Sequence, residues 1–371
     1  MFWFFVILIL VILVLIIFLY SIWKDEELDS QQSNKLDDSY LKETENISYI
    51  DSSVFSDDLS DLSIKNEDII EVKNQLNNTI IGMDGFLNAL LVNLFSNGHI
   101  LVEGLPGLAK TKTIKTLSKI MDFDFKRVQF TPDMMPSDIV GVEIYNQKDG
   151  QFYINKGPVF TDILLADEIN RTTPKVQSAL LEAMEEKQVS IGGYTHEISN
   201  PFFVLATQNP VEQEGTYTLP EAQVDRFLFK AIVNYPGKDD ESKIISSIEN
   251  EKNITTEKAL DKNKFFEIIK NIENVHVGED VKDYIARLVT CTRQEDSRVV
   301  YGASPRGSIS IYKASKVIAF FQNRDYVIHE DVQKIAILAL RHRLILSYQA
   351  MIEGYTPDQL LIEKLKKVTL E

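Results

Sequence analysis

Cysteine is nearly missing from this 371-residue sequence, because Cys291 is the only one. A lone cysteine forms no disulfide within the chain and no cysteine metal cluster, which fits a reducing compartment, and we interpret Cys291 as a small buried apolar residue. The five histidines show no metal-ligand spacing. The net charge of −16 argues against a nucleic-acid binder, because such proteins usually carry a basic face. Internal repeats with a period of about 20 to 50 residues are also missing, which argues against a repeat architecture.

Charge is absent from residues 2–20, which read FWFFVILILVILVLIIFLY. About 20 apolar residues in a helix span a bilayer, and Trp3 and Trp23 lie near the two ends, where indole rings favour the headgroup region. A cleaved signal peptide is the alternative, but no Lys or Arg precedes the run and no small-x-small cleavage site follows it. We therefore predict a single-pass membrane anchor at residues 1–23, and Lys24 places the following chain in the cytoplasm.

Apolar residues are sparse in residues 24–66, which are rich in Asp, Glu, Ser, Asn and Gln. Fourteen acidic residues and four lysines lie between Lys24 and Asp68, so this stretch supplies −10 of the net charge of −16. The composition predicts a mostly disordered tether. A solvated linker that stays off anionic lipid and an acidic recruitment surface are both open interpretations.

Residues 103–113, EGLPGLAKTKT, resemble the phosphate-binding pattern G-x-x-x-x-G-K-[ST]. The loop follows the apolar run HILVE, a predicted buried strand, and precedes a segment with helical spacing, which is the context that the pattern requires. Backbone N–H groups and the helix N-terminus would face the phosphates, the Lys110 ammonium would neutralise them, and the Thr111 hydroxyl would bind Mg²⁺. The predicted nucleotide-binding residues are Gly104, Leu105, Pro106, Gly107, Leu108, Ala109, Lys110 and Thr111.

Ala109 stands where the pattern has its last glycine. A methyl group is harmful there if the backbone needs a positive φ, and harmless if the residue already has the conformation of a helix's first turn. Because Gly104 and Gly107 still give the loop its freedom, we interpret Ala109 as a tolerated variant.

Two acids end the predicted buried strand within TDILLADE, residues 161–168. Chemistry gathers at the carboxyl ends of parallel strands, so Asp167 is placed to hold Mg²⁺ and Glu168 to orient and deprotonate the attacking water. Asn209 ends a further buried strand, PFFVLATQN, where it could touch the γ-phosphate or be a turn residue. Arg226 lies at a predicted helix end, just before an apolar strand. Taken alone, this position indicates a surface salt bridge.

After Pro236-Gly237 the pattern becomes helical, which predicts a helical lid domain at residues 237–371 behind an α/β domain at residues 67–236. Ser304-Pro305 opens one of these helices, because proline suits a helix's first turn, and this start would aim Arg306 into the cleft between the domains. Residues 341–343, RHR, are interpreted as a solvated or subunit-contacting helix face.

Taken in order, these segments resemble the MoxR branch of the AAA+ ATPases over about residues 67–371. The matching stretches are GLPGLAKT, QFTPDMMPSDIVG, LLADEINRTTPKVQSALLEAMEEKQVSIGG, FFVLATQNPVEQEGTYTLPEAQVDRF and GASPRGS. The resemblance implies a P-loop fold with a parallel five-stranded sheet flanked by helices and an all-helical lid. It also implies the site roles: Lys110 and Thr111 belong to Walker A and Asp167 and Glu168 to Walker B, while Asn209 is sensor 1, Arg226 the arginine finger and Arg306 sensor 2. Alanine before the loop lysine is usual in that branch.

The resemblance further implies ATP and Mg²⁺ as cofactors, and self-assembly into a ring, hexameric in related proteins, if Arg226 serves a neighbouring chain. Residues 140–160 and 188–199 are predicted hairpins. In related motors such hairpins face the pore, and Tyr153 or Tyr194 could grip a partner or pack on the sheet. Related proteins commonly work with partners that bear von Willebrand factor A domains. Met83 replaces the glutamine that family members often carry near the adenine.

Three functions stay open on the sequence. We expect a membrane-anchored ATPase that remodels or matures protein partners. A nucleotide-gated scaffold with negligible turnover is the second possibility, and a chelatase-type ATPase subunit is the third.

Overall fold

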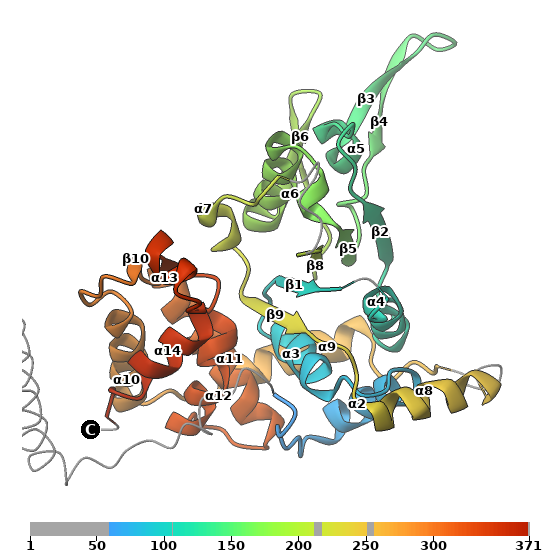
Figure 1. Ribbon diagram of the computed structural model, residues 1–371. Helices are drawn as coiled ribbons and strands as arrows, with labels where there is room; N and C mark the ends of the chain where they lie inside the picture. The colour runs from blue at the N-terminus through green and yellow to red at the C-terminus, as the bar shows by residue number, and fades with distance from the viewer. Residues whose placement is uncertain (1–58, 106, 211–216, 251–255, 370–371) are drawn as a thin grey trace, which may run out of the picture. The chain divides into compact units, whose positions relative to one another are not determined.

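The computed structural model describes residues 59–105, 107–210, 217–250 and 256–369 (Figure 1). The predicted anchor at 1–23 and most of the predicted tether at 24–66 lie outside these residues. Within the described part of the chain, no helix combines the length and the apolar character that crossing a membrane requires.

The last part of the predicted tether, residues 59–66, is packed rather than disordered. Leu59 and Leu62 are buried, and the Asn88 side chain donates a hydrogen bond of 2.6 Å to the Leu59 carbonyl. The two residues that end this segment donate backbone hydrogen bonds to the carbonyl of Phe321. The prediction missed this packing because the two buried leucines lie in an acidic stretch and form no periodic pattern.

A single parallel sheet forms the centre of the α/β domain, with the strand order β2-β5-β8-β1-β9. The predicted five-stranded parallel sheet is confirmed. Leu165 of β5 and Leu101 of β1 flank β8 at Leu205 and Ala206, and all four side chains are fully buried, as expected for strands covered on both faces. The strands are β1 (Ile100–Gly104), β2 (Phe125–Gln129), β5 (Ile163–Asp167), β8 (Phe203–Gln208) and β9 (Phe229–Val233).

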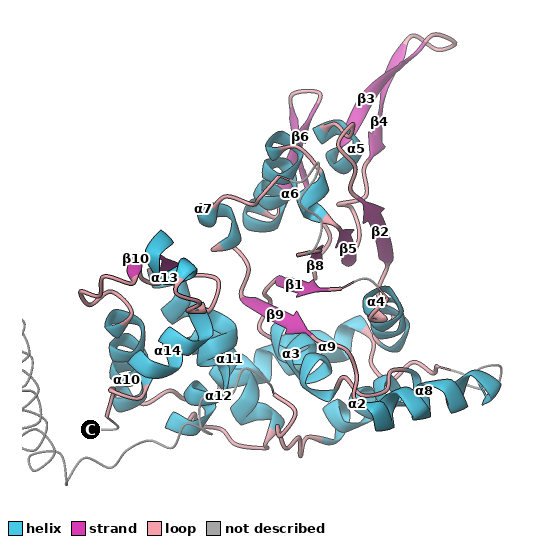
Figure 2. Cartoon of the chain, in the orientation of Figure 1, coloured by secondary structure: helices cyan, strands magenta, loops and turns pink. Residues whose placement is uncertain are grey.

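Helices flank this sheet (Figures 1 and 2). Alternate residues of three strands, Leu101, Leu164 and Val204, share one buried cluster with Val176 and Leu180 of α6. Contacts of α3 with β9 and of α4 with β5 add further cover. The helical elements of this domain are α2 (Glu67–Thr79), α3 (Asp84–Phe95), α4 (Lys110–Ile120), α5 (Pro136–Val140), η2 (Ile169–Arg171), α6 (Pro174–Glu186) and α7 (Glu221–Val224).

Both predicted hairpins are confirmed. The first is β3 (Gly141–Asn146) with β4 (Gln151–Lys156), and the second is β6 (Gln188–Ile191) with β7 (Tyr194–Glu197). Tyr153 and Tyr194 are exposed rather than packed on the sheet. Figure 2 shows the first hairpin as a long two-stranded ribbon.

The C-terminal region is mainly helical, as predicted, but it also contains a short antiparallel pair, β10 (Val299–Tyr301) with β11 (Ile345–Leu346), which corrects the all-helical expectation. The strands were missed because each has only two or three residues. The helix α11 begins at Pro305, as its sequence predicted, and Ser304 caps it by accepting a hydrogen bond from the Arg306 backbone. Cys291 is buried, and burial raises its pKa to about 11. The helices are α8 (Lys238–Asn250), α9 (Lys262–Glu273), α10 (Glu279–Cys291), α11 (Pro305–Phe321), α12 (His329–Leu340), α13 (Tyr348–Ile352) and α14 (Pro357–Leu365).

Candidate functional site

The loop that resembles the phosphate-binding pattern joins β1 to α4, as predicted. It borders a cavity of about 430 Å³, which we name the loop cavity. Lys110 lies at the first residue of α4, and its Nζ donates to the Gly104 carbonyl at 2.7 Å. Pro106 lies outside the described residues. The residues that line this cavity are Gly104, Gly107, Leu108, Ala109, Lys110, Thr111, Lys112, Arg127, Gln129, Asp167, Glu168, Thr207, Gln208 and Asn209.

The loop offers room for a phosphate at Gly107. This residue has φ of +86°, and a Cβ built on it would have no other atom within 4 Å. Desolvation lowers the pKa of Lys110, while Asp167 and Glu168 oppose that shift, so the ammonium lies near both carboxylates. A hydroxyl and a carboxylate at Thr111 and Asp167 are oxygen donors of the kind that Mg²⁺ prefers beside phosphate groups. The residues present therefore fit Mg-ATP.

Ala109 does not have the helical conformation that its tolerance was thought to depend on. Its φ is +50° and its ψ is 13°, which is the left-handed region. For a residue with a Cβ this conformation costs about 1–2 kcal/mol. The turn into α4 therefore imposes a glycine-like conformation on an alanine, and the chain carries this strain inside the loop.

Asp167 is held by two side chains that the sequence analysis did not identify. Arg127 of β2 forms a salt bridge to its Oδ2 at 2.6 Å, and the Thr207 hydroxyl of β8 donates to its Oδ1 at 2.7 Å. Both partners come from the strands that flank β5 in the sheet. Thr207 lies near the carboxyl end of the buried strand β8, and that position was a signal that could have revealed it, whereas Arg127 lies in the middle of the mostly exposed edge strand β2 and gave no such signal.

Glu168 is strained and held from two sides. Its φ is +57°, and its backbone N–H donates to the Thr207 hydroxyl at 2.8 Å. Its Oε2 accepts a hydrogen bond of 2.5 Å from the Gln129 amide and pairs with Arg171 Nε at 3.2 Å. Asn209 is buried at the end of the next strand, where its carbonyl accepts from Asn170 at 3.4 Å. Glu168 and Asn209 thus face the same cavity as Lys110.

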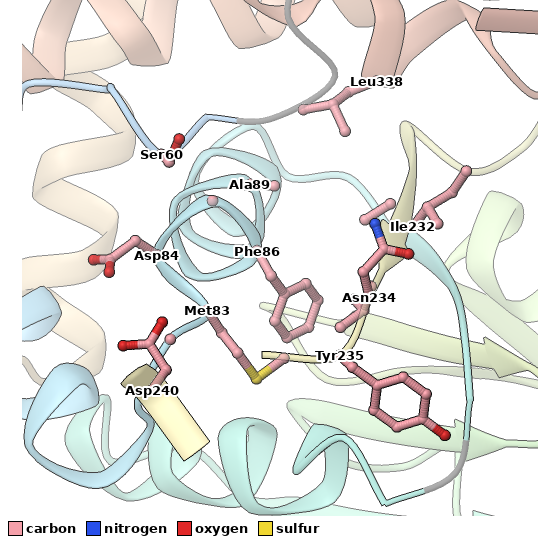
Figure 3. A pocket seen from close by; sticks show the side chains of 14 residues that line it. Ser60, Met83, Asp84, Phe86, Ala89, Ile232, Asn234, Tyr235, Asp240 and Leu338 are labelled. Atoms are coloured by element: carbon pink, nitrogen blue, oxygen red, sulfur yellow. The ribbon is translucent and has the colours of Figure 1, made fainter. Parts of the chain in front are cut away.

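A second cavity of about 330 Å³ is lined by residues that include Met83, Phe86 and Tyr235 (Figure 3). Val233 lines it and pairs in register with Gly104, which lines the loop cavity, so the neighbouring strands β9 and β1 each contribute to one of the two cavities. Figure 3 shows the side chains of Met83 and Phe86 directed toward the segment that carries Tyr235. Apolar and aromatic walls of this kind suit a purine ring. The residues along this cavity with polar or charged side chains are Ser60, Asp84, Asn234, Tyr235 and Asp240.

Arg226 and Arg306 do not line the loop cavity. They meet instead at one carboxylate, with Glu185 Oε2 at 3.2 Å from Arg226 Nε and Glu185 Oε1 at 2.5 Å from Arg306 Nη2. The three side chains border a cavity of about 320 Å³, which we name the arginine cavity. This placement agrees with the expectation that α11 aims Arg306 into the cleft between the domains, because the start of this lid helix faces the end of α6 in the α/β domain.

The interpretation of residues 341–343 as a solvated face is wrong. Arg341 and Arg343 are buried, and each is paired: Arg341 with Asp358 at 2.7 Å and Arg343 with Asp225 at 2.7 Å. Burial, with the cations Arg343, Lys230 and Arg341 nearby, depresses the pKa of His342. Charged residues at a helix end were buried because carboxylates elsewhere in the chain reach them.

Comparison with known proteins agrees with this geometry. The profile of the ATPase family associated with various cellular activities (AAA) matches residues 99–229, and an AAA lid domain profile matches residues 292–364. The uncharacterized protein YeaC of Bacillus subtilis is 45% identical over 294 residues, covering 79% of this chain and 92% of the relative. Chaperone MoxR1 of Mycobacterium tuberculosis is 43% identical over 313 residues, covering 81% of each chain.

A solved structure is also similar. The crystal structure of a Cytophaga hutchinsonii protein assigned as an ATPase superposes with a TM-score of 0.77 at 48% identity, covering 81% of this chain and 94% of that one. Relatives of such identity extend over both the α/β domain and the helical lid. The chain therefore belongs to the MoxR family of AAA+ ATPases and is an ATP-hydrolysing enzyme.

Proposed function

We propose that this enzyme couples Mg-ATP hydrolysis to the remodelling or maturation of partner proteins, as a ring of identical chains anchored in the membrane. Lys110 and Thr111 hold the phosphates and Mg²⁺ with Asp167, and Glu168 accepts a proton from the attacking water, which Asn209 helps to orient. Mg²⁺ supplies charge neutralisation at the β- and γ-phosphates when bound. The name of the MoxR1 relative, a chaperone, supports a protein substrate.

The separation of the arginines from the loop cavity is the observation that carries this proposal. The loop cavity contains the phosphate loop and the proposed base, but Arg226 and Arg306 line the arginine cavity instead. A guanidinium that stabilises developing phosphate charge can be supplied by another chain. A head-to-tail contact that places one chain's arginine cavity on its neighbour's loop cavity closes into a ring, and we expect a hexamer.

Mixing two inactive variants tests this arrangement directly. Glu168→Gln keeps the arginines but lacks the base, so it should trap bound ATP, whereas Arg226→Ala keeps the base but lacks the finger. Each full-length variant alone should hydrolyse ATP at least about 100-fold more slowly than wild type. An equimolar mixture should recover a substantial fraction of the wild-type rate, because some interfaces pair a complete loop cavity with an intact arginine.

Arg287→Ala is the matched control, since Arg287 pairs with Asp283 on the surface of α10 and lines neither cavity. An unrecovered mixture would rule out arginines that act between chains. Equal and negligible rates for wild type and Arg226→Ala would favour the scaffold function over a motor.

The β3–β4 ribbon is the surface that we propose for the protein partner. Register pairs Ile144 with Tyr153 on one face and Tyr145 with Phe152 on the other, and all four side chains are exposed. The Tyr145 and Phe152 rings pack on each other with centroids 5.1 Å apart. A partner with a von Willebrand factor A domain is our specific expectation. Affinity capture from solubilised membranes with the Glu168→Gln trap tests it, and the partner should be lost with Ile144→Ser and Phe152→Ser.

We also propose that residues 1–23 anchor the ring in the membrane, with the ATPase domain in the cytoplasm. The uncharged run at residues 2–20 supports this part of the proposal. The full-length chain should stay in the membrane pellet after alkaline carbonate extraction, and a chain that lacks residues 1–23 should not. Recovery of the full-length chain in the supernatant would contradict the anchor.

A further inference from the structure

Glu185 connects two arginines that come from different parts of the fold. It lies near the C-terminal end of α6, Arg226 follows α7 in the α/β domain, and Arg306 lies in the first turn of α11 in the lid. Each oxygen of the Glu185 carboxylate takes one guanidinium, at 3.2 Å and 2.5 Å. About a third or more of each of the three side chains is exposed, so another anion could reach both guanidiniums from solvent.

Cations outnumber carboxylates around this contact. Asp225, the other acid of the cavity, is engaged by Arg343 at 2.7 Å, lies 4.0 Å from Arg306 Nη1 and accepts hydrogen bonds from the Ser304 hydroxyl at 2.8 and 2.9 Å. Desolvation and the nearby Lys313 lower the pKa of Lys187, so two lysines repel each other at the same cavity. The cations that line the arginine cavity are Lys187, Arg226, Arg306, Lys313 and Arg343, and the acids are Glu185 and Asp225.

A surplus of positive charge at an open cavity indicates an anion from outside the chain. A carboxylate offers two oxygens in a plane, and a terminal phosphate offers three, so both can accept hydrogen bonds from two guanidiniums at once. In a ring, the phosphate that meets these arginines is the γ-phosphate in the neighbouring chain's loop cavity.

We infer that Glu185 is an internal counter-ion that occupies, in the single chain, the place that the γ-phosphate of a neighbouring copy takes in the ring. The inference rests on the proposed ring ATPase and adds a regulatory residue to it. Glu185 keeps the two arginines together while no neighbour is present. It also competes with the neighbour, because both guanidiniums must leave it before they bind phosphate.

The competition is modest, since exposed ion pairs are weak. Removing the charge with Glu185→Gln should therefore lower the protein concentration at which the ATP turnover per chain is half-maximal, by about three- to tenfold. Glu182→Gln, an exposed acid on the same helix, is the matched control and should keep the wild-type concentration. The full chain is used throughout, at saturating Mg-ATP.

A double variant separates competition from a general change in stability. Because Glu185 acts through the arginines, Glu185→Gln combined with Arg306→Ala should lose most of the gain that Glu185→Gln gives alone. Glu185→Asp keeps the charge but is too short to hold both guanidiniums as well, so its half-maximal concentration should fall between those of wild type and Glu185→Gln.

A half-maximal concentration for Glu185→Gln that equals or exceeds that of Glu182→Gln would overturn the inference. So would a gain that survives Arg306→Ala. Assembly measured by light scattering in the Glu168→Gln background, with ATP, gives a readout that does not need hydrolysis. If wild type shows no turnover, the proposed motor fails, while assembly of Glu168→Gln at lower concentration with Glu185→Gln would still support the counter-ion.

Discussion

The loop cavity and the arginine cavity differ in the groups they collect and in how those groups are held. In the loop cavity, the carboxylates of Asp167 and Glu168 are fixed by hydrogen bonds from the neighbouring strands, and Lys110 is tied to a backbone carbonyl. In the arginine cavity, two guanidiniums share the carboxylate of Glu185, and the Arg306 guanidinium also lies 4.0 Å from Asp225.

Rigid strands therefore position the acid–base chemistry, whereas exposed and exchangeable ion pairs position the arginines. A group that works on substrate in its own chain benefits from a fixed environment. Groups that meet a phosphate on another chain must first release their current partners. In the proposed ring, one chain would contribute two complementary parts of a site, and assembly would act at the arginine cavity.

Of the single changes in the loop cavity, removal of the loop lysine should have the largest effect on ATP binding. Lys110→Ala should weaken ATP binding about 100-fold or more, because several charge-assisted hydrogen bonds to phosphate are lost. Isothermal titration with the full chain measures it. Lys115→Ala, exposed on the same helix, should bind as wild type does. A binding constant that stays within a few-fold of wild type would show that nucleotide is held elsewhere.

Acid should destabilise the chain through a buried histidine that lines the arginine cavity. Burial lowers the pKa of His99 to about 4 from 6.5, so below pH 6.5 the unfolded chain takes up a proton that the folded chain refuses. Stability is therefore full above pH 6.5 and falls as the pH drops toward 4. Between pH 7 and pH 5 the free energy of unfolding should fall by about 2 kcal/mol from this group.

Denaturant unfolding of His99→Asn at the two pH values tests that assignment. The variant should lose less stability on acidification than wild type does. Phe202→Leu is the control, since the Phe202 ring packs edge-on against His99 with centroids 5.8 Å apart, and it should lower stability by a similar amount at both pH values. An unchanged pH dependence in His99→Asn would assign the proton uptake to other groups.

Removing a hydrogen bond that positions Glu168, the proposed base, should lower the turnover number less than removing Glu168 itself. Gln129→Ala deletes the 2.5 Å hydrogen bond to Glu168, and we expect the turnover number to fall about tenfold with nucleotide affinity unchanged. Steady-state kinetics measures the turnover number, and a separate binding experiment measures the nucleotide affinity. Lys126→Ala is the control, because Lys126 lies on the same strand but does not line the loop cavity. An unaffected turnover number would mean that Gln129 does not position the base.

The loop cavity was predictable from sequence because its parts follow from local order. One edge of any parallel sheet collects the ends of its strands. The phosphate-binding loop, the acid pair after a buried strand and the further strand before Asn209 all lie at that edge. The arginine cavity was not predictable in the same way. Arg343 and Asp225 are 118 residues apart, and their pairing decides that a charged helix end is buried. The partner of Arg306, Glu185, likewise depends on how the lid packs, which no local pattern records.

The backbone conformation of Ala109 could not be predicted from the loop sequence. A change at this residue should also have the smallest of the effects that we expect. The pattern showed that glycine was replaced, but the left-handed backbone at this position is set by the turn into α4. Ala109→Gly should relieve the strain and raise the free energy of unfolding by about 0.5–1 kcal/mol, because glycine's greater freedom in the unfolded chain offsets part of the gain. Ala286→Gly, on the exposed face of α10, should lower it by about 1 kcal/mol. Opposite signs in the two variants would separate backbone strain from the general cost of glycine, and a loss at both positions would contradict the strained loop.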